Sequence, residues 1–421
     1  MKGTMTHGRK KLAVLLFAAG FVAAWAAGQL RRSRDRAMVT NMMGQKQTVC
    51  VGRYLVDLPT ATEFSLSGER IAGFEIDTVE ESKAAFTDRV AAREAEIRAH
   101  DATDDRTGEG GMIDAHNLPV PSLFGRSFIY GRSRGYLMDG DRRIDMESVS
   151  VESHAHLKGL SFTLSATSVR EDRVKEAEAL LARLQVRGEN EIPSAPGFCI
   201  WRAVFAEPLP KHKSEWITLH VGLPGHPDVG MAFGSAASAS TDSTLLERIA
   251  HTDAEARIIE RLRVTKLRSG KRSINGIDGE EEIERVRELN FTTGYSFVWE
   301  SQGSPDDLSQ PYLLMNMETG TNPRPGGRPV KSSLDEDAAL ALWDYITLSI
   351  RRRPTRIIPS VHESKPVPFS DRDFLQSDNN LRVSSDVMSD KRELADRTRF
   401  KLQTTWSLAP NSIAKLVSTL P

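Results

Sequence analysis

One strand-like segment occurs twice in this chain, and this repeat is the feature that most limits the fold. "TVCVGRYLVDLP" spans Thr48–Pro59 and "GFCIWRAVFAEP" spans Gly197–Pro208. Each contains one of the two cysteines of the chain, followed by an aliphatic residue, a variable residue and an arginine. The separation of roughly 150 residues is too long for a solenoid repeat and fits a duplicated domain. The shared residues of the two copies are Cys50 with Arg53, and Cys199 with Arg202.

Possible helix starts repeat with nearly the same spacing in the two halves. Four segments have the Ser/Thr-x-x-Glu pattern of a capping box, in which the hydroxyl and the carboxylate each satisfy a free backbone amide. They are "TVEE" at Thr78–Glu81, "SVRE" at Ser168–Glu171, "TLLE" at Thr244–Glu247 and "SLDE" at Ser333–Glu336. The glutamates are 90 positions apart in the first pair (171 − 81) and 89 in the second (336 − 247). We expect each box to begin a helix. The first would continue to about Ala99 with Phe86, Val90 and Ile97 on its apolar side, and the third would carry Ile249, Ile258, Ile259 and Leu262 there.

Between the helices of each pair the sequence favours strands, as in "GLSFTLSAT" and "TGYSFVWES". The predicted fold class is α+β, with two similar domains that each contain an antiparallel sheet and two helices. The first domain would cover residues 45–188 and the second residues 197–354, joined by the polar, proline-broken linker Val186–Pro196. A chain of 421 residues is long enough for two cores. Residues 355–421 are rich in Ser, Asp, Arg and Pro and are expected to form a weakly ordered tail.

An apolar run near the N-terminus predicts export. Leu12–Leu30 holds 19 residues without a charge, which is near the minimum length of a membrane span. Ala24-Trp25-Ala26 would suit signal-peptide cleavage, whereas the following "RRSRDR" is unusual after a cleaved signal. Residues 1–36 are therefore predicted to be an export segment, either cleaved or kept as a single inner-membrane anchor, with the rest of the chain in the periplasm. Cys50 lies too far beyond this run for lipid attachment.

The motifs that look catalytic lack the surroundings that catalytic sites need. "GRSRG" at Gly131–Gly135 fits a serine nucleophile elbow at Ser133, but a strand-like run follows where a helix is required, so a hairpin turn is expected. His154 and His156 would share one face of a strand without further ligands, so a solvated pair is expected. The acidic run "DGEEEIE" at Asp278–Glu284 is expected to decorate a solvated strand or hairpin.

No cofactor, metal site or catalytic residue is therefore predicted, and a net charge of −1 gives no general attraction to nucleic acid. Cys50 and Cys199 are interpreted as buried free thiols, because equivalent positions in two domains need not be close. A disulfide that links the two halves is the alternative. An exported, duplicated protein without a catalytic constellation is best explained as a binding protein.

Three parts of the chain resemble one known family, the two-domain immunity proteins of type VI secretion that are cognate to phospholipase effectors of the Tle class. They are "CVGRYLVDLP" at Cys50–Pro59, the proline linker followed by "GFCIWRAVF" at Gly197–Phe205, and the helix that ends in "IRRRP" at Ile350–Pro354. The second copy departs from the first by placing Trp201 where the first has Gly52. The resemblance covers about residues 45–354.

The resemblance implies a periplasmic protein that binds and inhibits an injected phospholipase and is not itself an enzyme. It implies no cofactor. Two similar domains joined by a short linker would create a cleft that grips the effector from two sides. Inhibition would then come from covering the active-site mouth or from holding a lid shut.

Aromatic and arginine side chains in two loops are the candidate interface, because such residues dominate protein–protein hot spots. Ordinary surface loops are the alternative interpretation of both segments. Two other functions are also considered: a membrane-anchored serine hydrolase that uses Ser133, and a non-enzymatic envelope binding protein. The candidate residues are Leu123, Phe124 and Arg126 in "NLPVPSLFGR" and Arg324 and Arg328 in "GTNPRPGGRP".

Overall fold

The structure is a computed structural model, and it describes residues 33, 37, 39–101, 111–207, 209, 214–237, 239, 241–304 and 307–355. The predicted export segment and nearly all of the predicted tail lie outside the described residues. Within the described ranges, no helix is long and apolar enough to cross a membrane.

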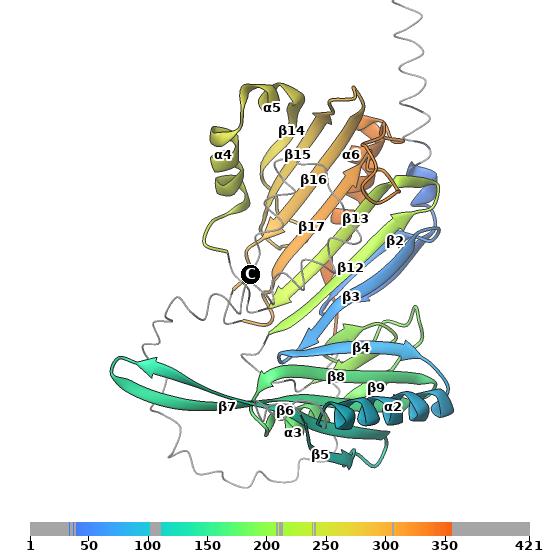
Figure 1. Ribbon diagram of the computed structural model, residues 1–421. Coiled ribbons are helices and arrows are strands. Elements are labelled where there is room, and N and C mark those ends of the chain that lie inside the picture. Colours follow the sequence, from blue (N-terminus) through green and yellow to red (C-terminus); the bar gives the residue numbers. More distant parts are fainter. Residues whose placement is uncertain are drawn as a thin grey trace, which may run out of the picture.

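A single antiparallel sheet of 12 strands runs through both halves of the molecule (Figure 1). Its C-terminal half contains, in spatial order, β14 (Val264–Lys271), β15 (Glu280–Arg287), β16 (Thr293–Ser301), β17 (Tyr312–Thr319), β13 (His226–Ala237) and β12 (Glu215–Leu223). Its N-terminal half continues with β3 (Glu63–Ile71), β4 (Phe74–Glu80), β8 (Leu160–Val169), β7 (Arg142–Leu157), β6 (Phe124–Asp139) and β5 (Met112–Asn117). The α+β class with antiparallel strands is confirmed. Because β12 pairs with β3, the two expected sheets form one continuous sheet.

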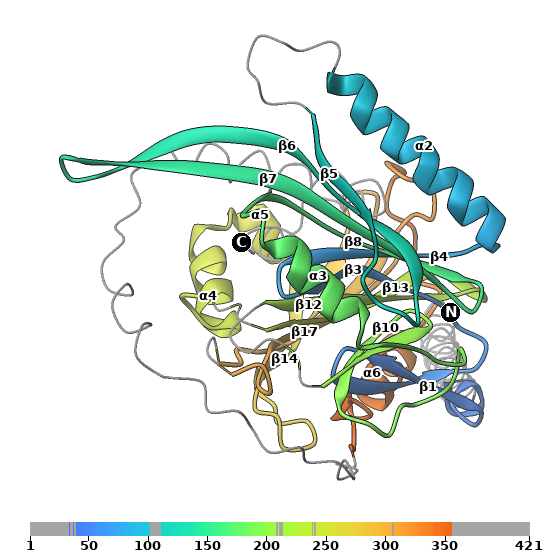
Figure 2. The ribbon, with the colours of Figure 1, turned by 90° about the horizontal axis from the view of Figure 1, so that it is seen from below.

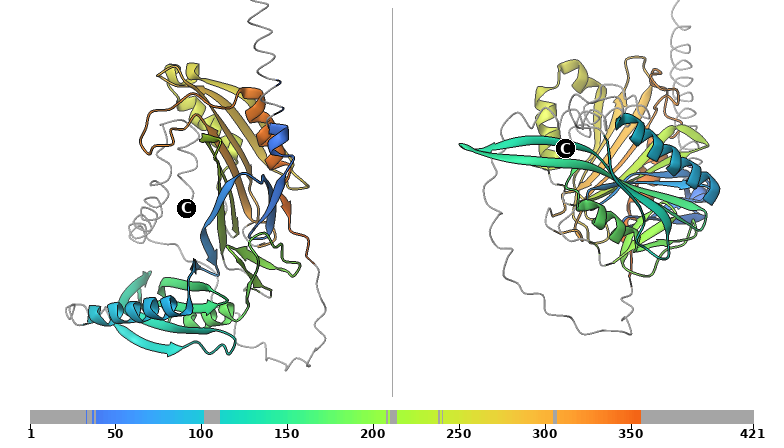
Figure 3. Two further views of the ribbon diagram at one scale, coloured as in Figure 1. Left: turned by 90° about the vertical axis from the view of Figure 1, so that its right-hand side faces the viewer. Right: turned by 60° about the horizontal axis from the view of Figure 1, so that its bottom comes forward.

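The sheet turns sharply between β3 and β4, which pair at Arg70↔Glu75 and Ile71↔Phe74. The N-terminal half therefore projects from the foot of the C-terminal half, and the molecule is L-shaped in side view (Figure 3, left). We call the side enclosed by the L the inner face and the opposite side the outer face. This angle decides which strand faces are available to a partner.

Among the described residues, helices pack on both faces of the sheet. In the N-terminal half, α2 (Lys83–Asp101) packs on Phe128, and α3 (Arg173–Leu181) lies on the opposite face (Figure 2). In the C-terminal half, α6 (Glu336–Thr347) covers the outer face, where Trp343 packs against Phe297 with ring centroids 5.4 Å apart. In the same half, α4 (Leu245–Glu255) contacts β15, and α5 (Ile258–Arg263) contacts the edge strand β14.

Only one of the four predicted capping boxes forms among the described helices. Thr244 accepts a hydrogen bond from the Glu247 amide at 3.4 Å, and the Glu247 carboxylate accepts one from the Thr244 amide at 2.8 Å. Thr78 and Ser168 instead lie inside β4 and β8, because the strand alternation continues through them. The last box is displaced by two positions, since Asp335 caps α6 by accepting from the Ala338 amide at 2.9 Å.

The apolar faces of the predicted helices are correct in part. Phe86, Val90 and Ile97 of α2 are buried against the sheet, as expected. The predicted third helix is broken after α4, and its expected apolar residues on α5 are exposed instead. The exposed residues are Ile258, Ile259 and Leu262.

Both copies of the repeated segment fold into tight β-hairpins that meet at their tips, and we call this pair the hairpin clamp. The first copy forms β1 (Lys46–Val51) and β2 (Tyr54–Pro59), with β18 (Arg351–Arg352) alongside β2. The second forms β10 (Gly197–Ile200) and β11 (Ala203–Ala206), with β9 (Leu184–Val186) alongside β11. Gly52 and Cys199 exchange two backbone hydrogen bonds of 3.0 and 2.9 Å across the clamp.

Cys50 and Cys199 form a disulfide, with their Cα atoms 5.9 Å apart. The expectation of two free thiols is wrong, because the pairing of β12 with β3 brings the two hairpin tips together. The disulfide lies in a small apolar cluster with Leu55 and Val204. It therefore closes covalently a junction that main-chain hydrogen bonds also hold.

The difference between Gly52 and Trp201 has a local cause. Gly52 begins the two-residue turn of the first hairpin with φ +57°, and a Cβ atom there would come within 2.9 Å of the Phe198 ring. In the second hairpin the left-handed residue is instead the next one, Arg202, at φ 57°. The second copy therefore has room for a tryptophan at its first turn position.

Candidate binding surfaces

The signature arginines of the repeated segment serve the junction between the halves. Arg53 donates from Nε and Nη2 to both carboxylate oxygens of Glu215, each at 2.7 Å, and its Nη1 lies 2.8 Å from Glu207. Burial lowers the pKa of Arg53, but the hydrogen bonds and charge of Glu215 raise it further, so the net shift is upward. Arg202 stacks on Trp201, whose amide donates to buried Glu69 at 2.8 Å. These contacts hold the clamp against the sheet.

Ser133 lies inside a strand, in a setting that excludes a nucleophile elbow. β6 continues past it to Asp139, and its neighbour across the sheet is Ser148 of β7. The hairpin turn expected at Gly131–Gly135 is wrong: the register shift between Tyr130 and Ser133 marks a bulge, and the chain reverses after Asp139. No helix N-terminus follows Ser133, so the backbone lacks the oxyanion site that such a serine needs.

The two histidines of "HAH" are packed under α2, so the expected solvated pair is wrong. His154 is only 3% exposed, and its ring nitrogens lie 3.0 Å from Thr163 Oγ1 and 3.1 Å from the Glu152 carboxylate. Arg93 of α2 and Tyr130 also bond to Glu152. Burial alone would raise the pKa of Glu152, but the hydrogen bonds that it accepts lower this pKa to about 2. Within the described residues, no cluster of three or more His, Cys, Asp or Glu side chains could hold a metal ion.

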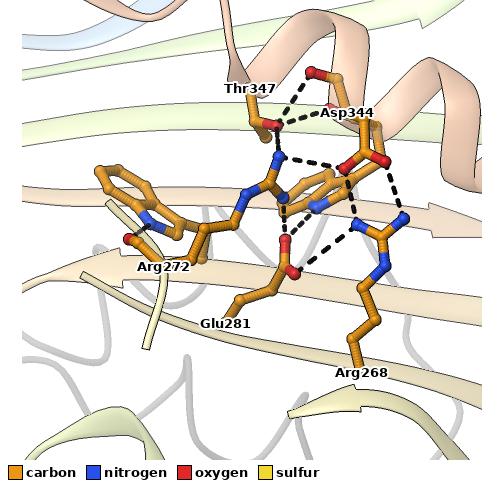
Figure 4. A network of polar contacts seen from close by, with 7 residues as sticks. Arg268, Arg272, Glu281, Asp344 and Thr347 are labelled. Carbon is orange, nitrogen blue, oxygen red and sulfur yellow. Dashed lines mark hydrogen bonds and ion pairs between the residues drawn. The ribbon is translucent and has the colours of Figure 1, made fainter. Parts of the chain in front are cut away.

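Three glutamates of the acidic run, Glu281, Glu282 and Glu284, are buried on the two faces of β15, so the predicted exposure is wrong for them, whereas Asp278 is exposed as expected. On the outer face, Glu281 accepts from Trp343 Nε1 at 2.6 Å and pairs with Arg272, and Asp344 binds Arg268 through both oxygens at 2.7 Å (Figure 4). This network fastens α6 to β14 and β15.

The inner-face glutamates of β15 are also buried. Glu282 is fully buried and pairs with Lys266 Nζ at 2.9 Å. Burial raises the pKa of the neighbouring Glu284 to about 7, with Glu282 adding to the shift. Both carboxylates are buried in the sheet, so they are not available to a partner.

The predicted interface residues fall into two separate groups. Phe124 and Arg126 begin β6 beside α2, where Lys83 lies 4.1 Å from the Phe124 ring and Glu94 binds Arg126 at 3.0 Å. Leu123 is in the core, so its side chain is not available to a partner. The second group, Arg324 and Arg328, is exposed in the loop after β17. β17 and β6 are separated by six strands of the sheet, so the structure does not bring the two groups together through the sheet.

Small and polar side chains, together with Trp216, occupy the inner face of β12 and β13. Trp216, Thr218 and His220 of β12 point to this face, because the alternate residues of the strand are in the core. The β13 residues opposite them are Ala236, Gly234 and Ala232. At Gly234 the nearest atom to an added Cβ would be 3.9 Å away. Glycine and alanine at these positions allow a partner chain to approach the sheet closely.

The long hairpin of β6 and β7, here called the ribbon, is a second surface that the sequence did not indicate. It extends well beyond the rest of the N-terminal half (Figures 1 and 2). Near its tip Tyr136, Met138 and Met146 are 60%, 51% and 55% exposed. Arg143 stacks over the Tyr136 ring at 4.4 Å. Exposed aromatic and methionine side chains on a projecting arm are typical of protein contact surfaces. The apolar residues on both sides of the tip in "YLMDGDRRIDM" were the available sequence signal.

Comparison with known proteins gives consistent results over most of the chain. The model of the Tle cognate immunity protein 4 N-terminal domain matches residues 47–193, and that of the C-terminal domain matches residues 191–355. A search among curated proteins finds no match.

Solved structures of immunity proteins have the same fold. The chain is 25% identical to a chain in the crystal structure of a Tle4–Tli4 complex (TM-score 0.61, 75% of this chain and 99% of that chain). It is also 25% identical to the apo immunity protein TplEi of the type VI secretion system from Pseudomonas aeruginosa (TM-score 0.60, 74% and 98%). TplEi in complex with the "L" peptide, at 24% identity, supports the fold alone (TM-score 0.59, 74% and 100%).

The fold and these matches define the class of immunity proteins of type VI secretion. The chain belongs to the Tle cognate immunity protein 4 family, as the repeated cysteine segments predicted. The clamp, which carries that signature, joins the two halves of the family fold.

Proposed function

We propose that this protein binds a type VI secreted phospholipase of the Tle class in the periplasm and inhibits it without catalysing a reaction. The match to both family domains over residues 47–355 carries the proposal. The likeness to an immunity protein in complex with its effector supports it. A hydrolase that uses Ser133 is not supported, because Ser133 lies within β6.

The two halves, residues 45–188 and 197–354, would act as one rigid unit in this function. The β12–β3 pairing, the disulfide and the Arg53–Glu215 pair all cross between them. A rigid L-shaped body loses little conformational freedom when it binds, which favours affinity. The inner face and the ribbon would then contact the effector together. The predicted residues Phe124, Arg126, Arg324 and Arg328 are candidate contacts at the rim of this interface.

The ribbon is the sharpest test of where the effector binds. Tyr136→Ala combined with Met146→Ala removes two of the exposed anchors without touching the core. If they are hot-spot residues, the Kd for the effector rises at least about tenfold, because each truncation costs more than about 1 kcal/mol. Leu348→Ala, at a residue 56% exposed beside the outer-face helix α6, is the matched control and leaves Kd unchanged. Equal Kd values for all three proteins would remove the ribbon from the interface.

The function itself is tested in cells. The gene that neighbours this one is expected to encode a lipase, and its product directed to the periplasm should kill a host. Coexpression of this chain should restore growth, and the chain should co-purify with the lipase. The Ser133→Ala variant should protect the host equally well. Death despite coexpression, or a need for Ser133, would contradict the proposal.

A further inference from the structure

A separate apolar patch lies at the end of the C-terminal half, on α5 and on the turn between β15 and β16. Five large apolar side chains there are 58–80% exposed. In α5 no side chain is buried, so all of its apolar residues point to solvent. We call this surface the α5 patch, and its residues are Ile258, Ile259, Leu262, Leu289 and Phe291.

The α5 patch is held in one shape by hydrogen bonds. Arg263 at the end of α5 donates to the Arg287 carbonyl at 2.9 Å and pairs with Glu288, which ties the helix to the turn. Within the turn, the Phe291 amide donates to the Glu288 carbonyl at 2.9 Å. The Asn290 side chain accepts from the Thr292 amide at 3.1 Å. The exposed side chains are therefore presented by a fixed framework.

Phe291 is both strained and exposed. It has φ 64°, a region that costs a bulky residue free energy, and its side chain is 80% in solvent. Neither feature is compensated by packing in the described structure. A strained, exposed aromatic residue is the kind of feature that a binding surface retains.

The charges around the α5 patch suit an anionic lipid surface. Arg257, Arg261 and Arg287 are exposed, and none of them forms an ion pair with another described residue. Of the acidic residues nearby, Glu288 pairs with Arg263, and Glu260 accepts from the Arg257 amide at 3.0 Å but keeps its charge. The three arginines therefore outnumber the one glutamate of α5. Apolar side chains flanked by arginines are the composition of segments that lie in the membrane interface.

The position of the α5 patch points to the same ligand. The first described residues, including the helical stretch 39–42, lie in the upper part of the molecule in Figures 1 and 3, toward the end where α5 and the β15–β16 turn are found. The apolar run Leu12–Leu30 directly precedes these residues in the sequence. If that run anchors the chain, the bilayer and the α5 patch would lie toward the same end of the molecule.

We propose that the α5 patch docks on the surface of the anionic phospholipid bilayer to which the N-terminal run leads. This proposal rests on the proposed periplasmic function, because it places the inhibitor on the surface where a phospholipase acts. The ribbon lies at the other end of the molecule (Figure 1) and stays free for the effector.

Lipid contact is tested by site-specific quenching on the full chain. Leu262→Cys or, as the control, Met146→Cys on the ribbon is labelled with an environment-sensitive fluorophore without reductant, so that the native disulfide stays closed. The two positions are 77% and 55% exposed. The proteins are reconstituted in vesicles of phosphatidylethanolamine and phosphatidylglycerol that carry nitroxide lipids. The label at 262 should be quenched and the label at 146 should not. Equal signals at the two positions would overturn the proposal.

Variants that place negative charge in the α5 patch separate lipid docking from effector binding. Ile259→Glu with Phe291→Glu should weaken docking about tenfold or more per substitution, and so abolish quenching at 262. Quenching should also fall when phosphatidylcholine replaces phosphatidylglycerol, since the arginines lose their counter-charge. Inhibition of the effector toward a soluble ester should be unchanged. If these variants instead lose inhibition, or the effector shields the label at 262, the α5 patch is a protein interface and the lipid proposal is wrong.

Discussion

Opening the Cys50–Cys199 disulfide should cost the protein a large share of its stability. The two residues are 149 positions apart, so the bond closes a long loop in the unfolded chain. In the chain-entropy model a loop of that length contributes about 5 kcal/mol at 25 °C. A typical domain unfolds with only about 5–15 kcal/mol. The double variant Cys50→Ala, Cys199→Ala should therefore lose about 5 kcal/mol of its unfolding free energy.

The variant should still fold, because the two hydrogen bonds between positions 52 and 199 are made by the backbone and do not need the cysteine side chain. Alanine is the right replacement, because both sulfurs lie beside Leu55 and Val204, where a serine hydroxyl would add a desolvation cost. Urea unfolding followed by fluorescence and by circular dichroism measures the difference. Reductant should bring the wild type to the level of the variant and leave the variant unchanged. A loss below about 1 kcal/mol, or a variant that reductant also destabilises, would refute this reasoning.

Three further expectations concern buried charge and the rejected active site. Arg53→Met leaves the Glu215 carboxylate buried without its partner and should cost about 3 kcal/mol in urea unfolding, whereas the same change at the exposed Arg70 should cost less than about 0.5 kcal/mol. The pKa of Glu284 is raised to about 7, so its contribution destabilises the fold as pH rises from about 4.5 to 7. Glu284→Gln should therefore gain up to about 3 kcal/mol over the wild type at pH 8 and almost nothing at pH 4, and a difference independent of pH would contradict the shift. Ser133→Ala should leave both stability and effector inhibition unchanged, and any loss of inhibition would return the serine to consideration.

Local sequence patterns predicted the parts of the fold that depend on neighbours in the chain. Phe86, Val90 and Ile97 were predicted correctly as the buried face of α2, because helical periodicity alone decides which face is apolar. The Thr244 box formed because the helix-favouring sequence begins there. Thr78 has the same box pattern, but cross-strand pairing of β4 with β8 overrode it.

Long-range contacts decided the features that sequence alone did not reveal. Glu281 is buried because Trp343, 62 positions away, donates to it, and no local pattern shows that partner. The cysteines meet because β12 and β3 join the halves into one sheet. The family signature was therefore recognised correctly, while its physical role as a disulfide clamp was not. The ribbon was missed because Gly131 and Gly135 suggested a turn, whereas β6 continues through a bulge between Tyr130 and Ser133 and pairs with β7 as far as Asp139.

Titration of the neighbouring lipase with this protein is the most direct test of the central claim. Purified effector is assayed on phospholipid micelles while increasing amounts of the chain are added. The account predicts that hydrolysis falls in proportion to added protein and ends near one chain per effector. Full phospholipase activity in the presence of a molar excess of folded, disulfide-bonded chain would contradict it.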